Sequence, residues 1–258
     1  MAAIGIDIGS TAAKTAVIED GKLVYTLVEP TGYNSVEAAK RLAQSLSKEG
    51  YDVQTCPVVA TGYGRVSVPF ANATVTEITC HGLGAAYLFG QDGVVIDIGG
   101  QDTKVIQLGG GRVKRFQMND KCAAGTGKFL EVMADRLGIT QEEMGTMARS
   151  GEQVAISSMC TVFAESEVIS LIGKGEPREN IANGVVESVV GRVSALAASS
   201  VNSLGSDEPC FLTGGLCENE YVIERLEANI KHPVVTCPEA RFAGAIGAAL
   251  TAEKKFSA

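Results

Sequence analysis

The chain has 258 residues, 45% of them hydrophobic and 20% charged, which suffices for one large domain or two modest ones and argues against a disordered chain. The formal net charge is −8 and no basic block occurs, which argues against a nucleic-acid partner because contacts to phosphate dominate that affinity. No signal-like segment opens the chain, and no run approaches the ~18 apolar residues of a membrane helix. We therefore expect a cytoplasmic protein with no membrane contact.

The sequence contains an internal repeat. Residues 4–14 align without gaps on residues 94–104, and isoleucine, aspartate, isoleucine, glycine and lysine coincide in the two copies. Each copy is a short apolar run that passes through a glycine turn into a second apolar run, which predicts a β-hairpin with a polar tip. Two ordinary hairpins with chance identity are the simpler alternative. An aspartate at the matching point of both apolar strands favours a true duplication.

The two hairpin tips carry groups suited to phosphate. Glycine lets backbone N–H groups approach a phosphate, and Ser10, Thr11 and Thr103 add hydroxyl donors. Asp7 and Asp97 are placed to hold Mg²⁺ through its water molecules. The two tips therefore predict a clamp on a triphosphate. The pattern GxxxxGK[ST] is missing from the sequence, so the chain is not a P-loop enzyme.

Helices and strands alternate along the rest of the chain. Apolar spacing and glycine stops predict helices over 35–48, 123–137, 161–172, 181–204 (as one helix or two) and 242–252, and strands over 58–62, 211–215 and 234–235. This alternation predicts two α/β lobes. We expect an N-terminal lobe over 1–92 and a C-terminal lobe over 93–258, whose final helix packs back near the first lobe.

A third feature follows the two phosphate hairpins. Small residues at 214–215 and 243–247 leave room for an adenosine against the backbone. In this order, the three features resemble the actin, hexokinase and heat-shock-chaperone ATPase superfamily over nearly the whole chain. The resemblance implies a two-lobed α/β fold of ribonuclease-H-like lobes. The residues expected to contact ATP or ADP are Ser10, Thr11, Ala12, Ala13, Lys14, Gly99, Gly100, Gln101, Gly214, Gly215 and Gly247.

The resemblance also suggests which residues bind Mg²⁺ and which act in ATP hydrolysis. Asp7 and Asp97 should serve Mg²⁺, while Gln101 and Asp102 should act on the γ-phosphate or the attacking water. Glu165 is an alternative for orienting that water, although an exposed helix carboxylate explains it equally well. For Lys104, a solvated strand residue is one interpretation, and it receives no assigned role.

Two of the seven cysteines stand directly before predicted helices. Cys122 and Cys160 would gain there from the positive end of the helix dipole, which also favours an anionic iron–sulfur cluster. Two thiolates are too few for a 4Fe-4S cluster, but a twofold axis would supply the other two. Small buried residues without metal, or a zinc site across a dimer, are the alternatives. The other cysteines and both histidines receive no ligand role: Cys56, Cys80, Cys210, Cys217, Cys237, His81 and His232.

A second, narrower resemblance bears on that choice. The stretches around Cys122 and Cys160, with residues 94–104 and 78–81, resemble the activator component of 2-hydroxyacyl-CoA dehydratases, a BadF/BadG/BcrA/BcrD-type ATPase family shared with benzoyl-CoA reductase ATPase subunits. The resemblance implies a homodimer with one bridging 4Fe-4S cluster. It also implies that ATP hydrolysis drives one electron from ferredoxin or flavodoxin onto a dehydratase.

The resemblance also suggests a hypothesis for the coupling. ATP would lie between the lobes, and lobe closure would move both cysteine-bearing helices. Two other classes remain as alternatives. A small-molecule kinase of the same fold would need no cluster, and a non-catalytic ATP-gated redox sensor would deliver no electrons to a dehydratase.

Overall fold

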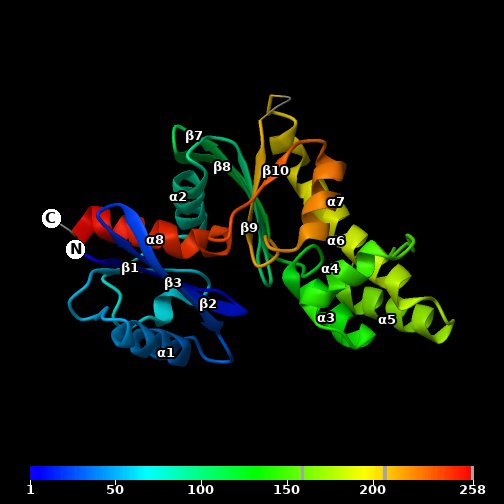
Figure 1. Ribbon diagram of the computed structural model, residues 1–258, viewed down its shortest axis with the longest axis horizontal. Coiled ribbons are helices and arrows are strands. Elements are labelled where there is room, and N and C mark those ends of the chain that lie inside the picture. The colour runs from blue at the N-terminus through cyan, green and yellow to red at the C-terminus, as the bar shows by residue number, and fades with distance from the viewer. Residues whose placement is uncertain (158–159, 206–207, 257–258) are drawn as a thin grey trace. The chain divides into compact units, whose positions relative to one another are not determined.

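The computed structural model describes residues 1–157, 160–205 and 208–256 (Figure 1). The chain divides into two compact units. Unit 1 comprises Met1–Asp92, Ile106–Phe116 and Cys237–Ala258, and unit 2 comprises Gly93–Val105 and Gln117–Thr236. The lobe boundary that the sequence suggests after residue 92 stays a prediction. The C-terminal helix belongs to unit 1.

The first five-stranded sheet has the order β3-β2-β1-β4-β5. Its central strand β1 is buried along its whole length, because α1 covers one face of the sheet and α8 the other. At Gly5 an added Cβ would lie 1.9 Å from the carbonyl oxygen of Ala245, so α8 runs directly against the backbone of β1. The elements are β1 (Ala3–Ile8), β2 (Ala12–Glu19), β3 (Lys22–Pro30), α1 (Ser35–Lys48), β4 (Val58–Thr61), the 3₁₀ turn Arg65–Ser67, β5 (Ala73–Thr74), α2 (Glu77–Phe89), the 3₁₀ turn Ala240–Phe242 and α8 (Ala243–Phe256).

The second five-stranded sheet has the order β10-β9-β6-β7-β8. Along the chain, β6, β7 and β8 come first, four helices follow, and β9, α7 and β10 complete the order. The last of the four helices, α6, is one continuous helix. The strands are β6 (Val94–Ile98), β7 (Thr103–Gly109), β8 (Arg112–Asn119), β9 (Cys210–Gly214) and β10 (Val234–Val235). The helices are α3 (Gly127–Leu137), α4 (Gln141–Arg149), α5 (Thr161–Gly173), α6 (Arg178–Val201) and α7 (Glu220–Ile230).

The two sheets repeat one another beyond the hairpins found in the sequence. In each, the aspartate strand pairs in parallel with a strand that ends in Thr-Gly, and Asp7 lies opposite Thr61 as Asp97 lies opposite Thr213. The next residue is a left-handed glycine in both copies, with φ of 90° at residue 62 and 89° at residue 214. Each hairpin also continues into a third strand, β3 or β8. The duplication predicted from the hairpins therefore extends over the whole sheet.

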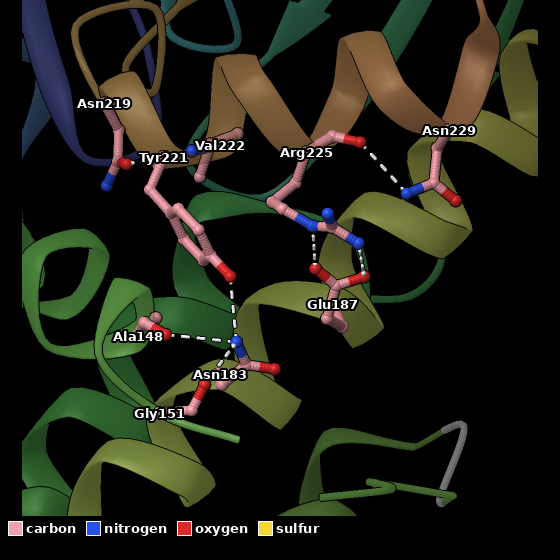
Figure 2. A network of polar contacts seen from close by, with 9 residues as sticks. All are labelled: Ala148, Gly151, Asn183, Glu187, Asn219, Tyr221, Val222, Arg225 and Asn229. Carbon is pink, nitrogen blue, oxygen red and sulfur yellow. Dashed lines mark hydrogen bonds and ion pairs between the residues drawn. The ribbon is translucent and has the colours of Figure 1, made fainter. Parts of the chain in front are cut away.

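A polar network holds the helices of unit 2 together (Figure 2). The side-chain amide of Asn183 on α6 donates to the hydroxyl of Tyr221 on α7 (2.8 Å) and to the carbonyl of Ala148 at the end of α4 (3.0 Å). One turn along α6, Glu187 forms a two-pronged ion pair with Arg225 of α7. These contacts fix α4 and α7 against α6.

Helix α6 also has the length and apolar character of a membrane span. Among the residues that the structure describes, it is the one helix that meets both criteria, over Arg178–Val201. Of its most apolar stretch, 56% is buried inside the protein, as in the core helix of a globular unit.

One expected helix boundary is wrong, and it bears on the site. The helix expected from residue 123 begins at Gly127, with Thr126 in an extended conformation before it and Gly125 at φ +82°. These two residues cannot continue a helix. Cys122 therefore lies in a loop, whereas Cys160 is the N-cap residue of α5, as predicted.

Candidate functional site

The first predicted phosphate turn joins β1 to β2. The N–H of Gly9 donates to the carbonyl of Ala12 (3.1 Å) and closes the turn. Thr31, just beyond β3, anchors it from behind, because its hydroxyl donates to the carbonyl of Gly9 (2.7 Å) and its N–H to that of Thr11 (3.0 Å). Ser10 is half-buried and Thr11 exposed, so the tip of the turn faces solvent. Ala12 and Lys14 are half-buried beyond it, and Ala13 is buried.

Asp7 lies at the end of β1, and its side chain is nearly buried, with 4% of the residue exposed. A Cβ added to Gly62 would lie 2.4 Å from its Oδ1, and one added to Gly244 would lie 2.6 Å from its Oδ2. The same added atom on Gly244 would lie 2.7 Å from Cε1 of His81, whose Nδ1 donates to a carbonyl of its own helix (2.9 Å). Two glycines thus keep side chains away from this carboxylate. Such a cradle fits a hydrated Mg²⁺ ion, which needs a carboxylate and space for its waters.

The second predicted phosphate turn joins β6 to β7 and closes like the first. The N–H of Gly99 donates to the carbonyl of Asp102 (2.9 Å), at positions that correspond to Gly9 and Ala12 in the first copy. Gln101 at the tip is exposed, and Asp102 is a quarter exposed. The two turns therefore close with the same hydrogen bond.

A buried charge cluster lies behind the second turn. The ammonium of Lys104 lies 2.7 Å from Asp102 and 3.4 Å from Asp97, and its side chain is 3% exposed. The hydroxyl of Thr213 donates to the other oxygen of Asp97 (2.8 Å). Lys104 is therefore a buried ion-pair partner, and the interpretation as a solvated strand residue is wrong. The ammonium of Lys104 already neutralises Asp97, which makes Asp7 the better candidate for Mg²⁺.

The glycines predicted to receive the nucleotide occupy different surroundings. Gly214 ends β9 in a left-handed conformation, and Gly215 donates to the carbonyl of Ile98 (3.0 Å) with open space at its own Cα. Gly247 is buried in α8, where an added Cβ would lie 1.8 Å from the carbonyl of Cys80 on α2. The close contact between α2 and α8 explains this glycine, and its role in nucleotide binding stays a prediction.

Cys122 and Cys160 line one pocket of about 440 Å³ in unit 2. Both are exposed free cysteines, although they come from segments nearly forty residues apart in the chain. The side-chain amide of Asn119 donates to the carbonyls of Cys122 (2.8 Å) and Ala124 (3.0 Å) and so shapes the loop that carries Cys122. The remaining lining residues are Thr103, Gly125, Arg192, Val193 and Leu196.

This pocket offers two of the four thiolates that an iron–sulfur cluster needs. Within residues 1–157, 160–205 and 208–256, three or more His, Cys, Asp or Glu side chains never gather closely enough to hold a metal ion. One chain therefore offers two thiols at the pocket, and a four-thiolate cluster or zinc site needs a second chain. Thr103, Asn119 and Arg192 were not singled out as neighbours of these thiols, because the sequence does not show which strand and helix line the loop.

The other cysteines differ from this pair. Burial raises the pKa of Cys80 and of Cys210 to about 12, so both remain protonated thiols at neutral pH. Cys217 is buried, and Cys56 and Cys237 are half-buried. Glu165, the alternative for orienting water, forms an ion pair with Arg136.

Two five-stranded sheets with duplicated Asp-Ile-Gly turns form the actin- and hexokinase-like ATPase fold, and the predicted fold class is confirmed. A ROK family glucokinase from Streptomyces griseus shares this fold, with a TM-score of 0.62 at 16% identity over 98% of this chain and 100% of that one. The model of the BadF/BadG/BcrA/BcrD ATPase family matches residues 4–252, and the chain belongs to that family. It is therefore an ATPase that binds ATP, as the sequence predicts.

Three relatives place the chain within the family. The (R)-2-hydroxyglutaryl-CoA dehydratase activating ATPase of Acidaminococcus fermentans is 42% identical over 98% of this chain and 97% of that protein, and its crystal structure (component A) gives a TM-score of 0.91 at 40% identity over all of both chains. The 2-hydroxyisocaproyl-CoA dehydratase activator of Clostridium difficile, with bound ADPNP, gives 0.90 at 36% identity over 99% and 95%. One of the benzoyl-CoA reductase subunits of Thauera aromatica is 32% identical over 95% of this chain and 91% of its own.

Proposed function

We propose that this protein is the ATP-dependent activator of a 2-hydroxyacyl-CoA dehydratase, to which it passes one low-potential electron received from ferredoxin or flavodoxin. The observation that carries the proposal is the meeting of Cys122 and Cys160 at one pocket, in a chain whose relatives include two dehydratase activators. We further propose that it acts in the cytoplasm, where thiols stay reduced.

In this proposal two copies of the chain form a homodimer around one 4Fe-4S cluster. Each copy supplies Cys122 and Cys160, because one chain contributes two thiols and the cluster takes four. When bound, the cluster would supply a one-electron carrier. Cys160 is the N-cap residue of α5, so a bound anionic cluster would lie near the positive end of that helix.

Each of the two duplicated turns would offer groups for the nucleotide. Ser10, Thr11 and Lys14, with the backbone of 12–13, would contact phosphates in the first turn, and Asp7 would hold Mg²⁺ through water. In the second turn, Gly99 and Gly100 would contact phosphates, and Gln101 and Asp102 would orient the attacking water. Asp97 would contribute less to Mg²⁺ binding than Asp7, because Lys104 already neutralises its charge.

A second assignment within the family is an ATPase subunit of a benzoyl-CoA-reductase-type enzyme. The observation in its favour is the 32% identity to the benzoyl-CoA reductase subunit of Thauera aromatica. Both assignments share the ATPase and the cluster, and they differ in the protein that accepts the electron.

An activation assay tests the proposal. Under anaerobic conditions, the protein with ATP, Mg²⁺ and a low-potential reductant should start turnover by 2-hydroxyglutaryl-CoA dehydratase, and ADP should not replace ATP. Asp7→Asn should abolish ATP hydrolysis and activation together, whereas Asp20→Asn, at the exposed turn of the same sheet, should leave both unchanged. ATP hydrolysis without activation of any dehydratase or reductase would favour the redox sensor, and phosphorylation of a small molecule would favour the kinase.

A further inference from the structure

The second phosphate turn is joined directly to the loop that carries Cys122. The carbonyls of Gly99 and Gly100 accept hydrogen bonds from the N–H groups of Gly127 (2.9 Å) and Lys128 (2.8 Å). These are the first two residues of α3, whose N–H groups have no partner within the helix. The phosphate turn therefore acts as the cap of the helix that follows the cysteine loop.

A third hydrogen bond reaches the loop itself. The hydroxyl of Thr103 donates to the carbonyl of Gly125 (2.6 Å), and both residues are buried. Thr103 follows Asp102 in the chain and also lines the pocket that contains Cys122 and Cys160. It stands between the residues proposed to sense the γ-phosphate and the residues proposed to hold the cluster. Its hydroxyl is engaged with the loop, so the expectation that it serves as a phosphate donor is wrong.

The first copy of the turn lacks this connection. There, Thr31, just beyond β3, binds the carbonyls of Gly9 and Thr11, whereas the start of α3 binds the turn carbonyls of the second copy. The position that corresponds to Thr103 is Ala13, which has no hydroxyl and is equally buried. The two turns close in the same way, and only the second is tied to a cysteine loop. The two copies therefore differ in the hydroxyl of Thr103 and its hydrogen bond to the loop that carries Cys122.

We propose that Thr103 is the positioning residue through which the nucleotide state of the second turn reaches the Cys122 loop. The inference rests on the proposed function for the identity of the cluster, but not for the link itself. A shift of residues 99–102 on nucleotide binding would be carried into α3 by two backbone hydrogen bonds and into Gly125 by the Thr103 hydroxyl. Asn119, which binds the carbonyls of Cys122 and Ala124, would pass that shift on to the thiol.

The test measures how strongly the nucleotide alters access to the cluster. The chelator bathophenanthroline disulfonate removes iron from the cluster-loaded full-length protein, and the rate is measured once in saturating ADP and once in saturating ADPNP. The saturating concentration of each nucleotide is determined for every variant, and the ratio of the two rates is the quantity compared. The wild type should show a ratio of about fivefold or more, the scale of an ordinary coupling between sites. Thr103→Val should bring the two rates closer together, while the two backbone hydrogen bonds to α3 remain. Thr103→Ser, which keeps the hydroxyl, should restore the ratio.

Controls separate this role from a structural one. Thr103→Ala installs the residue that the first copy carries at the same place, so it keeps the test open if valine does not fold. Loss of stability alone would speed iron removal in both nucleotide states and leave their ratio unchanged. A full ratio in Thr103→Val or Thr103→Ala, or a lost ratio in Thr103→Ser, would overturn the proposal.

The link is tested separately if the protein carries no iron. In that case the proposed function fails, and the alkylation rate of Cys122 in cluster-free protein becomes the measurement, under the same two nucleotides and in the same variants. A nucleotide dependence of the rate that weakens in Thr103→Val and Thr103→Ala and returns in Thr103→Ser supports the link. A rate that does not respond to nucleotide in the wild type overturns it.

Discussion

Replacing Lys104 by methionine should strongly destabilise the protein. The lysine side chain is 3% exposed and the Asp97 side chain 2%, so the substitution removes the ammonium from a carboxylate that water does not reach. Breaking a buried ion pair on one side costs about 3–5 kcal/mol. We expect about 3 kcal/mol, the lower end of that range, because Thr213 continues to donate to Asp97 and solvent partly reaches Asp102.

Urea unfolding of the full-length protein, followed by circular dichroism, measures this loss. The double variant Lys104→Met with Asp97→Asn should be at least about 1 kcal/mol more stable than Lys104→Met alone, because the buried charge has then gone as well. Lys174→Met, the same change at an exposed lysine, should alter the free energy of unfolding by less than about 0.5 kcal/mol. A loss below about 1 kcal/mol in Lys104→Met, or no recovery in the double variant, would refute the reasoning.

Two further predictions concern titrating groups. In cluster-free protein at mildly alkaline pH, iodoacetamide should modify the exposed Cys122 and Cys160 and spare Cys80 and Cys210, because burial raises the pKa of the latter two to about 12. Mass spectrometry of tryptic peptides measures the modification, and earlier reaction of Cys80 and Cys210 would contradict the prediction. The backbone N–H groups of Gly110 and Gly111 donate to the carboxylate of Asp92 and lower its pKa from the ordinary value of 3.8. The stability that Asp92 contributes is therefore present above pH 3.8 and is lost as the pH falls through the lowered pKa. The stability difference between wild type and Asp92→Ala should therefore shrink on acidification, and a difference independent of pH in urea unfolding would contradict this.

Much of the fold follows from local signals. The paired apolar runs and the repeated Asp-Ile-Gly predict both hairpins, and the 3.6-residue spacing predicts α1, which the structure places over Ser35–Lys48. Helix α2 was missed because it packs on more than one side. Gly82 on this helix lies against Val113, and Gly84 against the backbone of Ala243, so no single apolar stripe marks it in the sequence.

The site depends more heavily on contacts between distant segments. The sequence does not reveal whether a lysine near the start of an apolar strand is buried, and Lys104 is buried because Asp97 and Asp102 lie around its ammonium. The sequence predicts a helix from residue 123, directly after Cys122, but residues 123–126 form a loop. It departs from a helix because Gly125 is left-handed and because the phosphate turn receives the first N–H groups of α3.

The most direct test of the proposed function is the iron and sulfide content of anaerobically prepared protein, measured together with its molar mass by light scattering. We predict a dimer that carries the iron and sulfide of one 4Fe-4S cluster, and its loss in both Cys122→Ala and Cys160→Ala. Cys56→Ala, a change at a half-buried cysteine that does not line the pocket, should retain the cluster. A wild-type protein that holds zinc or no metal, or a full cluster in either variant of the pocket cysteines, would contradict the proposal.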